Sequence, residues 1–201
     1  MRLYYSPGAC SLAPHIVARE AGVPIELVKV DLATKTTEKG EDFLSINPKG
    51  SIPTLAFADG TVLTEGAVVS QFLADKAPGL GLLPAQGSFD RYRALEWLNY
   101  VATELHKSFS TLWRKDTPAE MRTIVRKNIG TKFSYLDRHL ASQDYLLGDH
   151  FGAADAYAFT MLSWAPAVGI DLANWPNLAA YAERIAARPK VRDALAVEGL
   201  V

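Results

Sequence analysis

The sequence contains a single cysteine, Cys10, among 201 residues, so the chain cannot form an internal disulfide bond. That absence excludes a disulfide framework and gives no reason to expect an oxidising compartment. No apolar run approaches the roughly 20 residues of a membrane span, and the N-terminus lacks the charged, apolar and small-residue order of a signal peptide. We therefore expect a cytoplasmic protein that has no membrane partner.

Clustered basic charge and metal-ligand spacing are also missing. The net charge is -1 with both signs interspersed, whereas nucleic-acid binding needs a concentrated basic surface. No spacing of His, Cys, Asp or Glu suits a metal ion, and no glycine-rich phosphate loop is present. We expect neither a nucleic-acid partner nor a metal cofactor.

The first 80 residues alternate short apolar runs with helical patterns. RLYY reads as a strand, SLAPHIVAREAG as a helix that ends at Gly22, and IELVKVDL as a second strand. Strand, helix and strand within about thirty residues predict a βαβ unit with parallel strands. After an irregular segment, TLAFADGTVLTE predicts a hairpin that turns at Asp59-Gly60, and GAVVSQFLADKA predicts a helix.

The second part of the chain is predicted to be all-helical. A stretch rich in Gly and Pro separates it from the first part, which gives domains at 1–80 and 88–201 and a linker at 81–87. Helical patterns then run over about 89–114, 118–142, 154–168 and 177–187, with a short one after Pro189. The predicted fold is an α/β domain followed by an all-α domain.

Cys10 follows a Pro-Gly-Ala turn and precedes Ser11, a good N-cap for the predicted helix. Unpaired N–H groups and the positive end of a helix dipole favour thiolate over thiol, so we expect the pKa of Cys10 to lie below the free value of about 8.5. The motif is C-S-L-A, without the second cysteine of C-x-x-C. Dithiol chemistry is therefore not expected, whereas exchange with an external thiol stays open, as does a buried inert thiol.

Two further motifs could bind a peptide-like ligand. In NPKGSIPTL, a cis bond before Pro53 would leave the backbone of Ile52 free to pair with an extended peptide, and a plain loop proline is the alternative. In LTEGAVV, the residues Glu65 and Gly66 open a helix whose first N–H groups could bind a carboxylate, while Glu65 could bind an ammonium group. The alternative for Glu65 is simple complementation of the helix dipole.

The long helix of the second part has two faces at helical spacing. The apolar face is formed by Leu95, Leu98, Ala102, Leu105, Phe109 and Leu112. The other face is polar but nearly uncharged, and it is formed by Tyr92, Glu96, Asn99, Thr103, His106 and Ser110. This polar stripe predicts a hydrogen-bonding cleft wall or an interface, with His106 as a candidate donor to a sulfur; a solvated face is the alternative.

Together these motifs resemble the glutathione transferases, most closely the bacterial beta class. YSPGACSLAPHIVARE, NPKGSIPTL, LTEGAVVSQFLAD, EWLNYVATELHKSF and FGAADAYAF stand in the family's order and spacing over essentially the whole chain. The resemblance implies a thioredoxin-like N-terminal domain, an all-helical C-terminal domain, and a homodimer that binds glutathione between the domains.

The resemblance also implies roles for particular residues. Cys10 would lie beside the glutathione sulfur and form a mixed disulfide with it, and His106 would approach both sulfurs. Ile52, before the cis residue Pro53, would pair with the cysteinyl part. The remaining glutathione contacts implied by the family are Glu65 and Gly66 at the γ-glutamyl end, Lys35 at the glycyl carboxylate, and Asn99, Thr103, Glu104 and Leu105 along the tripeptide. Part of that last group would reach over from the partner subunit.

Two positions depart from the family pattern. Gly66 stands where many members have serine, which removes a hydroxyl partner worth about 1.5–3 kcal/mol to a charged group. Gly152 stands at the family's helix cap, where Asp155 can still reach back to the cap N–H. Glycine at an N-cap costs only a few tenths of a kcal/mol, roughly, so we expect that helix to form.

The leading functional hypothesis is a glutathione transferase whose glutathione thiol attacks small electrophiles, with thiol-disulfide exchange through Cys10 on disulfide substrates as a further activity. One alternative is a non-enzymatic ligand-binding or regulatory protein on the same fold, and another is a glutathione-dependent isomerase or dehalogenase. The pocket for the second substrate is expected to involve Tyr5, Ser6, Phe109, Trp113 and Trp164 or their neighbours.

Overall fold

The N-terminal domain contains a five-stranded mixed sheet with the spatial strand order β3-β2-β1-β4-β5. The structure, a computed structural model, describes residues 1–201. The elements of this domain are β1 (Arg2–Tyr5), α1 (Leu12–Glu20), β2 (Glu26–Asp31), β3 (Thr36–Thr37), α2 (Phe43–Ile46), β4 (Thr54–Ala56), β5 (Val62–Thr64) and α3 (Gly66–Ala74). β1 and β2 are parallel, and the other neighbouring pairs are antiparallel. The predicted βαβ unit and hairpin are confirmed.

The segment predicted to be irregular contains β3 and α2. These elements are two and four residues long, which is too short for a hydrophobic period to show. The Asp42 side chain caps α2 by accepting from the N–H of Leu44 at 2.9 Å. Side-chain capping and pairing with β2 therefore hold this segment, and neither depends on a periodic pattern.

The second domain is entirely helical, as predicted. Its α-helices are α4 (Phe89–Tyr100), α5 (Lys107–Trp113), α6 (Ala119–Leu140), α7 (Ala153–Leu162), α8 (Pro176–Ala186) and α9 (Pro189–Val197), with a π-helix, η2 (Val101–His106), between α4 and α5. Short 3-10 turns lie at η1 (Pro78–Leu80), η3 (Pro166–Val168) and η4 (Leu172–Asn174). The helix predicted over 89–114 is thus three segments, and that predicted over 154–168 ends six residues early.

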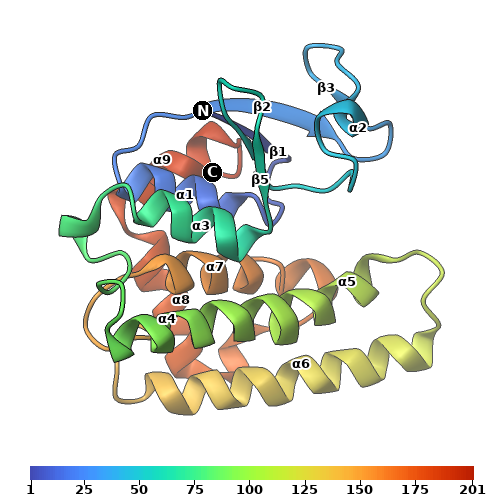
Figure 1. Ribbon diagram of the computed structural model, residues 1–201. Helices are drawn as coiled ribbons and strands as arrows, with labels where there is room; N and C mark the ends of the chain where they lie inside the picture. The colour runs from blue at the N-terminus through green and yellow to red at the C-terminus, as the bar shows by residue number, and fades with distance from the viewer.

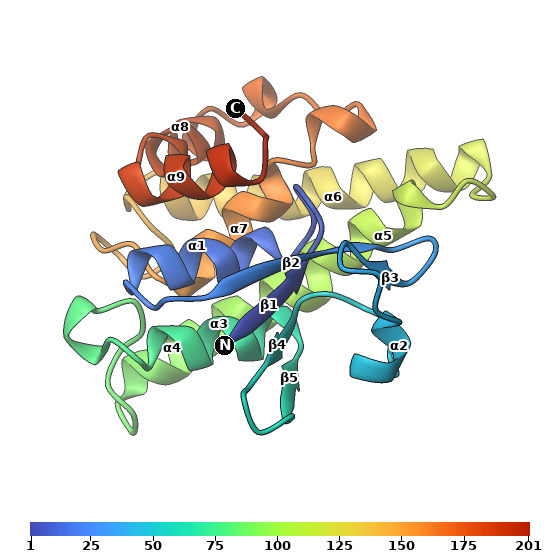
Figure 2. The same cartoon turned by 90° about the horizontal axis from the view of Figure 1, so that it is seen from above.

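The two domains share one apolar core. Figure 1 shows α1 and α3 beneath the sheet and above α7, and Figure 2 shows α1 between α3 and α9. All ten residues of α7 are buried, so this helix is enclosed by its neighbours on every side. A core cluster of 44 buried residues runs from the sheet through α1 and α7 to α9. Burial of that apolar surface fixes the orientation of the domains and hence the geometry between them.

Two buried or half-buried ion pairs also join distant parts of the chain. Arg91 makes two hydrogen bonds to Asp75, at 2.7 and 2.8 Å, which tie α4 to the end of α3. Arg188 makes two to Glu20, at 2.7 and 3.0 Å, which tie the start of α9 to the end of α1. Such bidentate pairs fix direction as well as distance.

Candidate active site

Cys10 lies in the loop between β1 and α1, and its side chain points toward the start of β4. The residue is 9% exposed, and its thiol donates a hydrogen bond to the carbonyl oxygen of Ile52 at 3.2 Å. Ser11 does not cap α1, contrary to the sequence prediction. Its backbone is already helical, and its hydroxyl bonds to the backbone of Ser6 instead.

The expectation of a lowered pKa for Cys10 is wrong. Burial raises the pKa of the thiol to about 11, and the negative charge of Glu65 adds to the increase. Hydrogen bonds from the backbone N–H groups of Cys10 and Ser11 act in the opposite direction, as the helix-start argument requires, but they are the smaller effect. In this structure Cys10 is a neutral thiol.

Residues far along the chain hold the loop that carries Cys10. The indole N–H of Trp164 donates to the carbonyl of Gly8 at 2.7 Å, and the N–H of Gly8 donates to the Glu198 carboxylate at 2.9 Å. The other oxygen of Glu198 lies 2.8 Å from Nδ1 of the buried His15. The helical domain therefore fixes the backbone two residues before the thiol.

The peptide bond between Ile52 and Pro53 is cis. The N–H of Ile52 donates to no acceptor within the chain, while its carbonyl accepts from Cys10. Asn47 braces this turn, because its amide donates to the Ser51 carbonyl at 2.8 Å and to the Thr54 hydroxyl at 2.9 Å. The result is a rigid strand end with a free donor next to a thiol.

Glu65 and Gly66 form the start of α3. Glu65 has a positive φ of 68°, and its carboxylate lies 2.7 Å from Nζ of Lys49. A Cβ on Gly66 would lie 3.6 Å from the Tyr157 hydroxyl and 3.7 Å from Pro53, which is ordinary van der Waals contact. The packing at residue 66 therefore leaves room for the serine that many family members have there.

Lys35 lies between β2 and β3, and its side chain reaches the loop that precedes Ile52. Its backbone φ is 59°, and its amino group donates to the Gly50 carbonyl at 2.8 Å. Lys35, Gly50 and Cys10 all line one cavity. The amino group of Lys35 thus lies at the end of the cavity that Gly50 lines, where it could bind an anionic group.

His106 ends the π-helix and faces α7. Its Nδ1 lies 2.7 Å from the hydroxyl of Tyr157, and its ring packs edge-on against Trp164 with centroids 5.3 Å apart. Burial, with a smaller contribution from the charge of Lys107, lowers the pKa of His106 to about 4. The imidazole is therefore neutral at physiological pH.

The other residues predicted along this helix are divided between faces. Asn99 and Thr103 are exposed, as is most of the polar stripe. The carboxylate of Glu104 pairs with Lys132 of α6 at 2.9 Å, and Leu105 is fully buried in the core. Within one protomer the side chains of Glu104 and Leu105 thus contact α6 and the core.

Tyr157 is a site residue that the sequence analysis missed. It is 2% exposed, and its hydroxyl contacts His106 and lies beside Gly66. Burial raises the pKa of Tyr157, and the negative charges of Glu65 and of Cys10 in its ionised form raise it further, so the phenol stays protonated. Its only sequence signal is a polar group within the apolar run AADAYAF, where a buried hydroxyl must find a partner.

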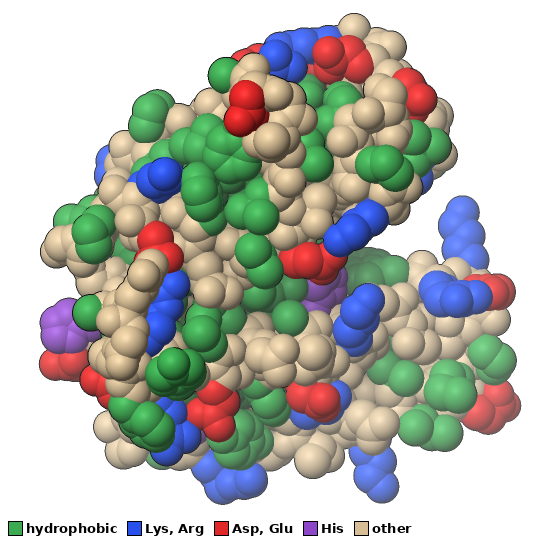
Figure 3. All heavy atoms as spheres, in the orientation of Figure 1, with side chains coloured by type: hydrophobic (Ala, Val, Ile, Leu, Met, Phe, Trp, Pro, Cys, Tyr) green, Lys and Arg blue, Asp and Glu red, His purple; other side chains and the backbone are tan.

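A cavity of about 530 Å³ opens next to Cys10 between the domains. Of the residues expected near the second-substrate pocket, Trp113 and Trp164 line this cavity and Tyr5 and Ser6 do not, while the ring of Phe109 packs edge-on against Trp164. Figure 3 shows the hollow between the domains, with basic, acidic and histidine side chains gathered around it. Its walls are largely apolar and aromatic, which suits a flat apolar molecule.

The glycine at the cap of α7 has a steric explanation. A Cβ on Gly152 would lie 3.0 Å from the carbonyl oxygen of Leu82, too close for a side chain without a shift of the backbone. Asp155 accepts from the Gly152 N–H at 2.8 Å. The prediction that Asp155 reaches back to the cap and that the helix survives is confirmed.

No group of three or more His, Cys, Asp or Glu side chains is arranged to hold a metal ion. No helix has the length and apolar character needed to span a membrane. The described features are thus a buried thiol, a free backbone donor, a carboxylate, an amino group and a neutral imidazole.

The fold and this site define a thioredoxin-like thiol protein that carries an all-helical second domain. Residues 8–76 match the model of the glutathione S-transferase N-terminal domain, and residues 97–189 match that of the C-terminal domain. Glutathione S-transferase GstA of Escherichia coli O157:H7 is 48% identical over 200 residues, with both chains covered in full. The chain belongs to the glutathione S-transferase family.

Solved structures agree with this assignment. A sphingomonad glutathione S-transferase complexed with glutathione has a TM-score of 0.96 and 47% identity, with both chains covered in full. The bacterial beta class enzyme of Sphingomonas chungbukensis also has a TM-score of 0.96, with 43% identity over the whole of both chains. The resemblance to the beta class is therefore confirmed.

Proposed function

We propose that this glutathione transferase binds glutathione as an extended tripeptide along Ile52 and uses the glutathione thiol, not Cys10, as its nucleophile. The observation that carries the proposal is the free N–H of Ile52 next to the buried Cys10 thiol. An extended peptide satisfies such a strand end by backbone pairing. Glu65 would then hold the γ-glutamyl ammonium group, and Lys35 the glycyl carboxylate.

The raised pKa of Cys10 supports a role as hydrogen-bond donor. A thiol with a pKa of about 11 stays protonated at neutral pH and can donate a hydrogen bond to the glutathione thiolate once that sulfur displaces the Ile52 carbonyl as acceptor. The neutral imidazole of His106 would orient the same sulfur. Electrostatic stabilisation of the thiolate lowers its pKa, and proximity to the aromatic pocket directs its attack.

The reaction class that follows is transfer of glutathione to a small apolar electrophile. The glutathione sulfur forms a bond to the electrophilic carbon, and the leaving group departs with the bonding electrons. Trp113 and Trp164 would hold the electrophile against the sulfur, since both line the cavity next to Cys10. Exchange with disulfide substrates through a mixed disulfide needs the Cys10 thiolate, so it would be favoured only at high pH.

Substitution at Cys10 tests whether its thiol acts as a hydrogen-bond donor in conjugation and as the reactive group only in disulfide reduction. Cys10→Ser keeps a hydrogen-bond donor and should retain conjugation of glutathione to an activated chloronitrobenzene, whereas Cys10→Ala removes the donor and should lower kcat/KM for it. At high pH, where the Cys10 thiolate forms, both variants should lose the glutathione-dependent reduction of disulfides that the unmodified protein shows. Loss of conjugation in Cys10→Ser to the level of Cys10→Ala would contradict the donor role.

A homodimer in the cytoplasm completes the proposal. Large exposed side chains on the outer faces of α4 and α6 support an interface there: Phe89 is 70% exposed, Tyr92 63% and Tyr135 46%. The exposed Asn99 and Thr103 would complete the glutathione site across that interface. A reduced co-substrate and one free cysteine suit a reducing compartment. Sedimentation at micromolar concentration tests the dimer, and a monomer would contradict it.

A further inference from the structure

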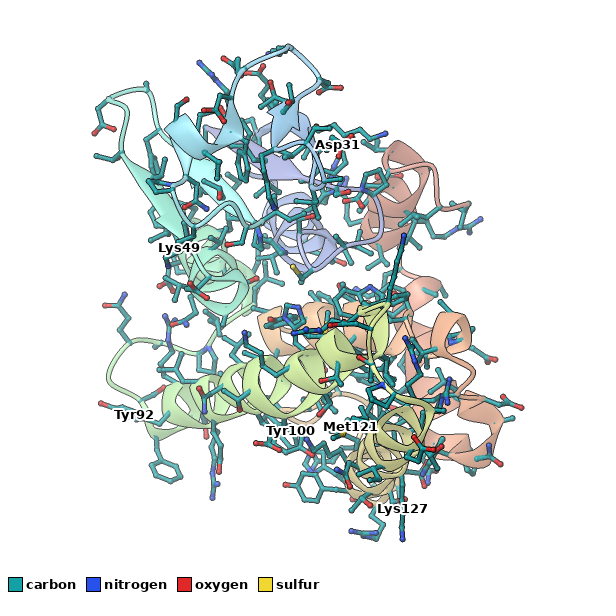
Figure 4. The ribbon with its side chains drawn as sticks, turned by 90° about the vertical axis from the view of Figure 1, so that its right-hand side faces the viewer. Asp31, Lys49, Tyr92, Tyr100, Met121 and Lys127 are labelled. Carbon is teal, nitrogen blue, oxygen red and sulfur yellow. The ribbon has the colours of Figure 1, made fainter.

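Lys49 forms an ion pair with Glu65, the residue whose carboxylate the γ-glutamyl ammonium group would need. Its Nζ lies 2.7 Å from Oε1 of Glu65 and donates to the Thr64 hydroxyl at 3.0 Å. Figure 4 shows Lys49 at the edge of the N-terminal domain that lies nearest α4. Both side chains of the pair are more than half exposed. A ligand whose ammonium group binds Glu65 therefore has to share or replace its contact with Lys49.

The backbone of Lys49 is fixed while its side chain is free. Its N–H donates to the side-chain oxygen of Asn47 at 3.1 Å, and the next N–H, of Gly50, donates to the Asn47 carbonyl at 2.8 Å. Asn47 is 2% exposed. The amino group can therefore move within a few ångströms around a fixed Cα, because only exposed methylene groups connect them.

The γ-glutamyl end of glutathione is a zwitterion, with an ammonium group and a carboxylate on the same carbon. Glu65 can bind only the ammonium group. Gly66 offers the carboxylate no side-chain donor, although the space for one is present. When the ammonium group takes Glu65, Lys49 loses its partner at the same place where an unpaired carboxylate arrives. Binding thus breaks the weak, exposed Lys49–Glu65 pair and forms two pairs, Glu65 with the ammonium group and Lys49 with the carboxylate. The exchange is favourable because only one weak pair is lost.

We infer that Lys49 recognises the α-carboxylate of the γ-glutamyl group, in place of the side chain that residue 66 lacks. Lys49 is then a specificity-determining residue, and Lys49 with Glu65 forms a matched pair for the two charges of the zwitterion. This inference rests on the proposed glutathione site. If Lys49 only competed with the ammonium group for Glu65, it would weaken binding of the ligand. If it binds the carboxylate, it strengthens that binding.

The test is calorimetric binding of S-methylglutathione, whose sulfur cannot exchange, and of its analogue with a 4-aminobutanoyl group in place of γ-glutamyl. Lys49→Met should raise the Kd for S-methylglutathione about three- to fivefold, as expected for an exposed charge pair, whereas the Kd for the analogue should stay unchanged or fall, because the analogue has no carboxylate for Lys49. Lys39→Met is the matched control, because Lys39 forms a comparably exposed pair with Glu26 away from the cavity. Gly66→Ser in the Lys49→Met background should restore part of the affinity.

Each result decides the question. Tighter binding of S-methylglutathione to Lys49→Met, or an equal change for both ligands, would overturn the role of Lys49 while leaving the glutathione site intact. Failure of the unmodified protein to bind S-methylglutathione would overturn the site itself and this inference with it. Circular dichroism of each variant shows that the exposed substitutions leave the fold unchanged.

Discussion

The reactivity of Cys10 toward an alkylating reagent should depend on pH with a midpoint near 11. The chain has one cysteine, so iodoacetamide labelling followed by mass spectrometry reports this thiol alone. Burial raises its pKa from 9.0 to about 11, an increase of two units that corresponds to roughly 3 kcal/mol against the thiolate. At pH 7.5 the thiolate fraction should be about 300-fold lower than for a free thiol of pKa about 8.5.

Restricted access to the buried sulfur would slow labelling equally at every pH, so it lowers the plateau without moving the midpoint. The same protein unfolded in urea should give a midpoint near the free value of about 8.5. Glu65→Gln should lower the midpoint in the folded protein, because the Glu65 charge is one cause of the increase. A midpoint below 8.5 in the folded protein would refute the reasoning that burial raises the pKa of Cys10 by more than the N–H groups at the helix start lower it.

The same difference in pKa affects stability. Because the folded pKa of Cys10 exceeds the unfolded one, the folded state binds its proton more tightly. The contribution is complete below about pH 8.5 and declines by up to roughly 3 kcal/mol as the pH rises through 11. Urea denaturation of the unmodified protein and of Cys10→Ser between pH 8 and 10 should show this slope only for the former.

Three further predictions concern buried groups. The pKa of His106 is about 4, so the pH profile of kcat/KM for conjugation should contain no step near pH 6.5 that His106→Asn abolishes; such a step would contradict the neutral imidazole. The Ser70 hydroxyl is buried without a hydrogen-bond partner, so Ser70→Ala should raise the free energy of unfolding by about 1 kcal/mol in urea, and a decrease would show an unseen partner. Asp155 is fully buried and accepts hydrogen bonds from Leu146, Gly152 and Tyr181, so Asp155→Ala should cost about 3 kcal/mol or more by the same assay. A loss below 1 kcal/mol would contradict that accounting.

The fold was predictable where hydrophobic periods are long. The βαβ unit, the hairpin and the long helices α6 and α8 follow directly from such patterns. The π-helix over Val101–His106 was not predictable, because one wider turn barely changes a hydrophobic stripe. It lies at the site, where Glu104 pairs with Lys132 and His106 contacts Tyr157, whereas the burial of Leu105 follows from the predicted apolar stripe.

The pKa of Cys10 was the main error of the sequence analysis, and its cause lies far away in the chain. A helix start is a local feature that ten residues reveal, and it favours a thiolate by only about 0.3–1 kcal/mol. The opposing burial depends on Trp164 and Glu198, which hold the backbone of Gly8 from 156 and 190 residues away. Packing of the helical domain against this loop contributes to the burial that leaves Cys10 only 9% exposed beside the cavity. Because the resulting neutral thiol is a donor, the reactive sulfur has to arrive with the ligand, and the specificity of the protein depends on how well Ile52, Lys35 and the Lys49–Glu65 pair hold that ligand.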